Sequence, residues 1–304
     1  MNSAIRLPFA LQRRLNATVQ TLLYGESDGE SDFNRPFREE ALISPESVSW
    51  RVFKNPIALF VGGTAAVILE LADPSVCAGI WEFSSFRKNP LGRLQRTGLA
   101  AMITVYAARS IAEPMIARIV RMHAAIQGKT PSGASYAASD PRLLTWVHAT
   151  AAFGFGEAYS RYVSPLSEGE VNSLYVEGTP VSRLYGASAP PNSVDEMRAL
   201  FESAGAQFSR SAVIFEFLRI MRDTVALPRP FHWIQPMLVR AAVELIPGWI
   251  RARLGLSESY GLHQHERWLT KLIGASSDRI VLPASPAVQS CLRLGLPMTY
   301  LYAS

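Results

Sequence analysis

Apolar residues in this chain recur at helical spacing, and short polar breaks separate the apolar runs. Four of these breaks place Asn or Asp directly before proline, which is the signature of a helix N-cap followed by proline at the first helical position. The pattern predicts helices that begin at these prolines and cover residues 56–71, 74–83, 90–106 and 141–153. Four such starts within fewer than ninety residues predict an all-helical core.

The rest of the chain shows the same pattern. A helix is expected from about residue 110, with Gly128 as its C-cap glycine and Pro131 shortly after. Ser167 and Glu170 have the spacing of a capping box. No strand ladder, fixed-period repeat or low-complexity tract is recognised, so the expected fold class is all-α. Further helices are expected over residues 167–177, 197–204, 209–224, 235–244, 247–254 and 257–274.

The polarity of the chain divides it into three parts. Residues 1–50 are expected to form an N-terminal arm, which is acidic and turn-rich over residues 25–49 and carries an amphipathic helix over residues 11–23. Residues 51–275 are expected to form one helical domain. Residues 276–304 form a C-terminal tail whose secondary structure the pattern leaves ambiguous.

The longest apolar run covers residues 57–81, but it contains Glu70, Asp73 and Pro74. A helix that spans a membrane needs roughly 20 apolar residues without such breaks. The run therefore predicts two buried helices joined at Asp73-Pro74.

Composition narrows the classes of function. Hydrophobic residues make up 48% and charged residues 18% of the chain, as in a globular protein with a large core. The net charge is +5, but the cations are dispersed along the chain, which argues against nucleic-acid binding. Cys77 and Cys291 form no disulfide framework, so a reducing, cytoplasmic location is expected, with peripheral membrane contact left open. Residues 1–25 lack an unbroken apolar core and are interpreted as neither a signal peptide nor an anchor.

His123 is the residue that the candidate chemistry depends on most. It falls within an apolar helical stripe formed by Ala112, Ile116, Ile119 and Ile126. An inward-facing histidine must be neutral, hydrogen-bonded or bound to a ligand, and a neutral core histidine is the commoner case. The motifs before and after His123 in the sequence provide the evidence that distinguishes these interpretations.

Arg93 and Thr97 are four residues apart, so they share a helix face, which Thr104 continues. A guanidinium and a hydroxyl that face an apolar bundle suit a propionate, a phosphate or another anion. The alternative is an ordinary ion pair of Arg93 with a carboxylate such as Glu82 or Glu113.

The other histidines give weaker signals. His148 is also expected to face inward. It could be a second iron ligand, a distal acid–base group or a hydrogen-bonded core histidine, and the last interpretation is favoured. His263 and His265 would diverge by about 200° on a regular helix, so they are expected on the surface and not around one metal ion. The common motifs of phosphate loops, dinucleotide sites, serine hydrolases and zinc proteases are not found.

Several short motifs follow one another in a distinctive order. They are Gly62-Gly63, Leu71-Ala72-Asp73-Pro74, Asn89-Pro90, Arg93-Leu94-Gln95-Arg96-Thr97, Val120-Arg121-Met122-His123-Ala124, Trp146-Val147-His148-Ala149-Thr150 and Ile246-Pro247-Gly248-Trp249. In order and spacing, over roughly residues 52–256, they resemble the catalytic domain shared by MpaB-type oxygenases and latex-clearing rubber oxygenases.

The resemblance implies a single globin-like helical bundle that encloses one haem b. It implies that His123 is the ligand of the haem iron and that Arg93 and Thr97 lie at the haem. His148 is a further candidate for contact with the cofactor.

The resemblance also implies catalytic roles for Arg93 and Thr97 and a catalytic carboxylate, for which Glu82 is the candidate. A lysine that some rubber oxygenases carry beside the Thr corresponds to Arg96 here. The implied activity is a haem-dependent oxygenase, an oxidoreductase that uses dioxygen to oxidise or cleave an unsaturated apolar substrate, either an isoprenoid- or lipid-like small molecule or a polymer. The alternatives are a non-catalytic helical carrier of haem or of a hydrophobic ligand, and a peripheral membrane protein that binds through residues 11–23.

Overall fold

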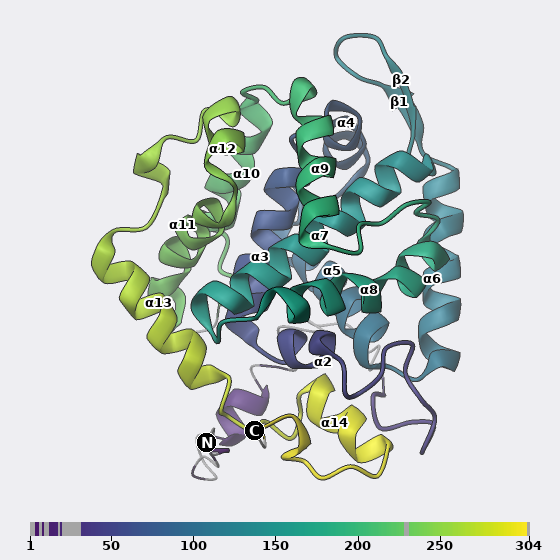
Figure 1. Ribbon diagram of the computed structural model, residues 1–304, viewed down its shortest axis with the longest axis vertical. Helices are drawn as coiled ribbons and strands as arrows, with labels where there is room; N and C mark the ends of the chain where they lie inside the picture. The colour runs from purple at the N-terminus through teal and green to yellow at the C-terminus, as the bar shows by residue number, and fades with distance from the viewer. Residues whose placement is uncertain are drawn as a thin grey trace.

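The computed structural model describes residues 4, 5, 8, 12–17, 19, 32–227 and 231–302. Within these ranges the chain is mostly helical, with a single small sheet, which confirms the all-α fold class (Figure 1). The α-helices are α2 (Val48–Phe53), α3 (Pro56–Glu70), α4 (Pro74–Phe83), α5 (Pro90–Tyr106), α6 (Arg109–Ala124), α7 (Pro141–Tyr162), α8 (Glu168–Tyr185), α9 (Val194–Ala204), α10 (Ala212–Asp223), α11 (Gln235–Leu245), α12 (Gly248–Leu254), α13 (Gln264–Ser277) and α14 (Pro286–Arg293). The strands are β1 (Gln127–Lys129) and β2 (Ser135–Ala137), and the short 3₁₀ helices are η1 (Gly205–Gln207), η2 (Phe231–Ile234), η3 (Glu258–Tyr260) and η4 (Tyr300–Tyr302).

The four helix starts expected from Asn-Pro and Asp-Pro pairs are all present. Asn55, Asp73, Asn89 and Asp140 are the N-caps of α3, α4, α5 and α7, and each side chain accepts a hydrogen bond from a backbone N–H in the first turn. The capping box predicted at Ser167 opens α8. These helix starts are confirmed because the cap and the proline act locally.

Two glycines let α3 and α7 cross in direct backbone contact at the centre of the molecule (Figure 1). A Cβ on Gly62 would lie 2.7 Å from the carbonyl oxygen of Gly154, and a Cβ on Gly154 would collide with the carbonyl of Gly62. This contact outweighs the cost of glycine within a helix, about 1 kcal/mol. As a result α7 continues to Tyr162, beyond its predicted end at residue 153.

The expected helix boundaries also differ later in the chain. α8 continues past its predicted end at residue 177 and stops at Gly186, whose φ is 102°. The single helix predicted over residues 257–274 is divided into η3 and α13, and His263 is the N-cap of α13. His263 and His265 are exposed as predicted, but their rings stack with centroids 5.8 Å apart. The predicted divergence is wrong because His263 stands outside the helix.

The predicted C-cap role of Gly128 and the predicted absence of paired strands are both wrong. α6 ends at Ala124, and Gly128 lies in β1, opposite Tyr136 of β2. A Cβ on Gly128 would lie 2.7 Å from the hydroxyl oxygen of Tyr136, so the tyrosine ring needs a glycine there. Gly133, with a φ of 89°, lies in the turn of this hairpin.

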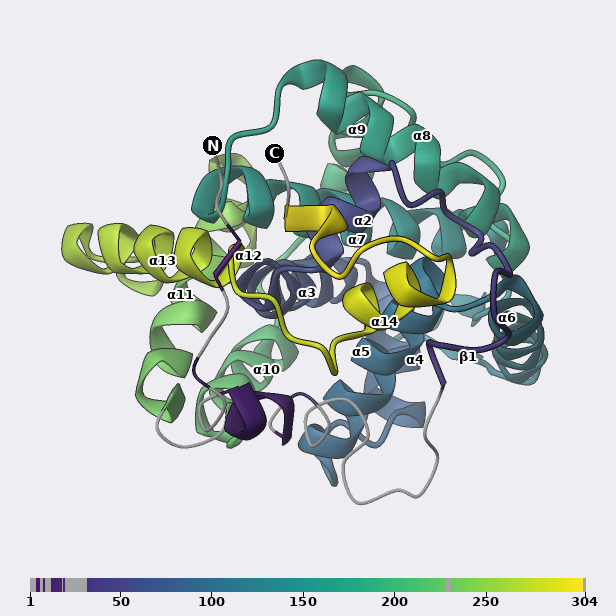
Figure 2. The ribbon, with the colours of Figure 1, turned by 90° about the horizontal axis from the view of Figure 1, so that it is seen from below.

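Residues 33–43 and 287–301 pack on one face of the bundle, around α2, α5 and α14 (Figure 2). Phe33 and Trp50 share a buried cluster with Tyr106 and Cys291. The guanidinium of Arg293, 1% exposed, donates hydrogen bonds to the backbone carbonyls of Glu39, Phe33 and Tyr106. One buried side chain therefore joins residues 33–39, α5 and α14.

No described helix is by itself both long and apolar enough to cross a membrane. Only α3 and α4 together have the required length and composition, and they bend by 111° at the break between them. Of the helix expected over residues 11–23, residues 12–17 and 19 are described and helical, and the others lie outside the described residues.

Candidate functional site

His123 lies one residue before the end of α6 and faces the interior. Ala112 and Ile116 on the same stripe are buried and His123 is half-buried, which confirms the predicted inward face. The Nδ1 atom of His123 is buried without a hydrogen-bond partner among the described residues. Burial, and then the charge of Arg93, lower the pKa of His123. The side chain is therefore a neutral imidazole with an unsatisfied ring nitrogen.

His148 on α7 is a second interior imidazole close to the first. Burial, and then the charge of His123, lower the pKa of His148 to about 4. Its ring centroid lies 5.0 Å from that of Tyr185, whose hydroxyl is 3.0 Å from the hydroxyl of Thr104 on α5. α5, α6, α7 and α8 therefore each bring a polar side chain to the same part of the interior.

Arg93 and Thr97 share one face of α5, as predicted. The guanidinium of Arg93 donates a hydrogen bond to the hydroxyl of Thr97, which in turn donates one to the backbone carbonyl of Arg93 at 2.9 Å. Arg93 is half-buried, but Thr97 is exposed, so the prediction that both side chains face an apolar bundle is wrong for Thr97. The alternative ion pairs are not formed, because Glu113 lies 3.7 Å from Arg109 and no ion pair of the described residues includes Glu82.

Glu70, the last residue of α3, was not among the candidates from the sequence. Burial raises the pKa of its carboxyl group to about 7, and the charge of Arg93 acts in the opposite direction. Glu70 and Arg93 nevertheless form no ion pair or hydrogen bond with each other in the described structure. Asp73, the other carboxylate of the apolar run, caps α4 and accepts a hydrogen bond from Arg142 at 3.0 Å. A carboxylate without a capping role in an apolar helix is the sequence signal that identifies Glu70.

Glu82 and Arg96 lie outside this cluster. Glu82 is exposed near the C-terminal end of α4, and its charge, after burial, helps to raise the pKa of Tyr136. Arg96 is exposed and donates a hydrogen bond to the hydroxyl of Ser85. The catalytic role of Glu82 stays a prediction that no contact to Arg93 supports.

Four partly buried groups form what is here named the polar cluster: Glu70, Arg93, His123 and His148. Each pKa in the cluster responds to the charge of another member. Beyond the effect of burial, the charge of Arg93 acts to lower the pKa of Glu70 and of His123, and the charge of protonated His123 acts to lower the pKa of His148. Such a cluster holds a carboxyl group with a pKa near neutrality, a guanidinium that could bind an anion and two neutral imidazoles that could donate a lone pair.

The residues of the polar cluster can be compared with what a metal ion and a haem each require from a protein. No group of three or more His, Cys, Asp or Glu side chains is arranged for a metal ion within the described residues. A haem iron needs only an axial ligand from the protein, and a neutral imidazole is a common one. His123 offers that nitrogen, and Arg93 offers a cation, in no ion pair among the described residues, for a propionate group.

Comparison with known proteins gives one match. A family model described as "ER-bound oxygenase mpaB/B'/Rubber oxygenase, catalytic domain" matches residues 50–276. Searches of curated proteins and of solved structures gave no match.

Proposed function

We propose, because this chain belongs to the family of ER-bound mpaB/B' oxygenase and rubber oxygenase catalytic domains, that it is a haem b-dependent oxygenase. Membership of an oxygenase family places the chain among the oxidoreductases. The proposal adds the haem and an unsaturated apolar substrate that reacts with dioxygen. The observation that carries it is the polar cluster, whose four members lie on partly buried positions of α3, α5, α6 and α7.

His123 is proposed as the side chain that would hold the haem iron. Its neutral ring needs no deprotonation, and its position near the end of a long helix fixes its direction. Arg93, held by Thr97, is proposed to bind a haem propionate. Bound haem would supply iron for dioxygen chemistry, which the polarity of the surrounding pocket then directs.

Glu70 is proposed as the group that takes up a proton from the substrate. An acid–base group works best when its pKa is close to the working pH, and burial brings the pKa of Glu70 to about 7. His148, with a pKa of about 4, stays neutral and can only offer a hydrogen bond or a lone pair at neutral pH.

An apolar substrate is favoured by the neighbours of the polar cluster. Val67, Leu94, Ile126 and Val147 belong to the same helices or adjoin them, and they are partly buried against the largest hydrophobic cluster. A substrate with little hydrogen-bonding capacity loses least on entering such surroundings. An isoprenoid-like or lipid-like alkene meets this requirement.

Dioxygen uptake by the haem-loaded protein tests this assignment, with a squalene dispersion as the alkene and squalane as its saturated control. Uptake of dioxygen is expected with squalene and not with squalane. Glu70→Gln should lower the rate about a hundredfold at unchanged haem content, as expected for loss of an acid–base group. Glu82→Gln is the matched control and should change the rate less than about twofold. If Glu82→Gln abolished uptake while Glu70→Gln did not, the base would be Glu82. Haem binding without uptake of dioxygen for any alkene would favour a carrier.

The cytoplasmic location and the peripheral membrane contact are proposed on the sequence alone. Flotation with anionic liposomes, with and without residues 1–25, tests the contact.

A further inference from the structure

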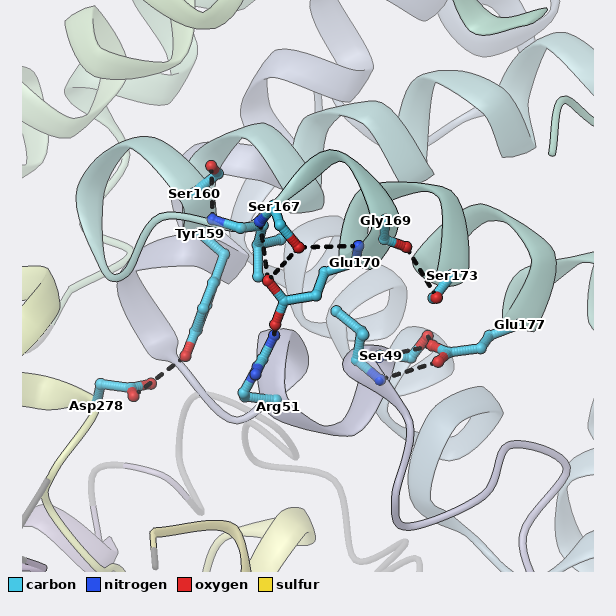
Figure 3. Close-up of polar contacts among 12 residues, drawn as sticks. Ser49, Arg51, Tyr159, Ser160, Ser167, Gly169, Glu170, Ser173, Glu177 and Asp278 are labelled. Atoms are coloured by element: carbon cyan, nitrogen blue, oxygen red, sulfur yellow. Dashed lines mark hydrogen bonds and ion pairs between the residues drawn. The ribbon is translucent and has the colours of Figure 1, made fainter. Parts of the chain in front are cut away.

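A second polar site lies away from the polar cluster, where α2, the start of α8, the end of α13 and η4 meet. A cavity of about 180 Å³ opens there. Charged and phenolic side chains dominate its lining. Figure 3 shows the contacts between Arg51 and Glu170 and between Tyr159 and Asp278. The principal lining residues are Arg51, Lys54, Tyr159, Glu170, Asp278 and Arg279.

Asp278 is fully engaged within the protein. Its Oδ2 atom lies 2.8 Å from Nζ of Lys54 and accepts a hydrogen bond from the hydroxyl of Tyr159 at 3.3 Å. Its Oδ1 atom accepts a hydrogen bond from Nδ2 of Asn55 at 3.2 Å. Lys54 is equally committed, because Nζ also donates to the backbone carbonyl of Asp278 and lies 4.6 Å from the ring centroid of Tyr302.

Glu170 is also engaged, as the N3 residue of the α8 capping box. It accepts hydrogen bonds from the backbone N–H and the hydroxyl of Ser167 at 2.8 and 2.9 Å, and another from Nη2 of Arg51. These contacts, with Arg51 first, lower the pKa of Glu170 to about 2. Neither carboxylate of the lining therefore has a free charge to offer a cation.

Arg51 uses only part of its guanidinium. Its one hydrogen bond within the described structure runs from Nη2 to Glu170, and its Nε atom is buried without a partner (Figure 3). A guanidinium normally forms two parallel hydrogen bonds with an oxyanion, and an unsatisfied buried N–H is costly.

We propose that this cavity binds a phosphate group, with Arg51 as its principal ligand. A phosphate oxygen would satisfy Nε of Arg51, which is buried without a partner among the described residues. The volume of about 180 Å³ suits a small anion, since sites for drug-sized ligands have roughly 300–1,000 Å³. The phosphate belongs either to the free ion or to the headgroup of an anionic lipid.

Titration calorimetry with sodium phosphate, at an ionic strength held constant with chloride, tests the site. The wild type should bind one phosphate saturably. Arg51→Met should bind at least about tenfold more weakly, as expected from the loss of charged hydrogen bonds. Arg198→Met removes an exposed arginine that pairs with Asp195 and should leave phosphate binding unchanged.

Glu170→Gln gives the opposite prediction and protects the test against misfolding of the Arg51 variant. Glutamine preserves the capping box but removes the charge that competes for Arg51. Phosphate should therefore bind about fivefold more tightly, as expected for removal of one nearby like charge. No saturable binding by the wild type, or no tightening in Glu170→Gln, would overturn the proposal.

Co-sedimentation with phosphatidic acid vesicles, beside phosphatidylcholine vesicles, identifies the source of the phosphate. Sedimentation that requires both phosphatidic acid and Arg51 assigns the site to a lipid headgroup. Calorimetric binding without sedimentation assigns it to the free ion.

Discussion

Glu70 and Arg93 perturb each other's pKa without forming an ion pair. Glu70 ends α3 and Arg93 lies in the first turn of α5, so two helix ends bring opposite charges close together in the interior. Burial opposes ionisation of both groups: it raises the pKa of Glu70 and lowers that of Arg93. Two ionisable groups held in the interior without a direct ion pair lower the stability of the fold, which favours a role in binding and proton transfer.

Glu70 should make the stability of the protein fall as the pH rises. The pKa of its carboxyl is about 7 in the folded chain against 4.5 for an ordinary Glu, so the folded state binds the proton more tightly between these values. The resulting stabilisation is complete below about pH 4.5 and is lost as the pH rises through 7. The wild type should therefore lose up to about 3 kcal/mol of unfolding free energy, relative to Glu70→Gln, when the pH rises from 5 to 8. Urea denaturation at both pH values measures it, and a pH-independent difference between the two proteins would contradict the assignment.

The crossing of α3 and α7 should not tolerate a methyl group. Gly62→Ala places a Cβ against the backbone of Gly154 and should cost about 3 kcal/mol of unfolding free energy. Gly178→Ala is the matched control, since Gly178 lies in α8 with no atom within 4 Å of its would-be Cβ. That variant should be stabilised by about 0.5–1 kcal/mol, because alanine is the better helix former. Equal effects of the two changes would show that the close crossing is not a constraint.

Arg293 should hold residues 33–39 and α14 against the helical bundle. Arg293→Met keeps the length of the side chain but leaves the carbonyls of Phe33 and Glu39 without this donor, at a cost of about 3 kcal/mol. The carbonyl of Tyr106 loses one donor and keeps the hydroxyl of Ser290. Limited proteolysis should then cut within residues 33–47 before the rest of the chain. Arg198→Met, on the surface, should change stability by less than about 0.5 kcal/mol. Unchanged protease resistance in Arg293→Met would refute this role.

Local signals made the helix starts predictable. Asn55, Asp73 and Asn89 each cap the helix that their own following proline opens, so no distant contact is needed. The inward face of His123 was predictable for the same reason, because helical periodicity alone orients it. The shared face of Arg93 and Thr97 follows from their spacing of four residues.

Contacts between distant segments set the features that the sequence did not predict. Gly128 has the sequence appearance of a helix C-cap, but its role is to accommodate the ring of Tyr136 in a hairpin. An uncapped carboxylate in an apolar helix distinguishes Glu70 in the sequence, but spacing along the chain does not predict that Glu70, and not Glu82, lies near the charge of Arg93. The length of α7 depends likewise on the glycine contact with α3.

The most direct test of the central claim is the visible absorption spectrum and pyridine haemochrome content of the haem-reconstituted protein, for the wild type, His123→Ala and His148→Ala. His265→Ala, at an exposed position, is the control. The account predicts a haem b spectrum in the wild type and the control, a lost or strongly shifted Soret band in His123→Ala, and a retained band in His148→Ala. A wild-type protein that takes up no haem, or a Soret band that His123→Ala leaves unchanged, would contradict it.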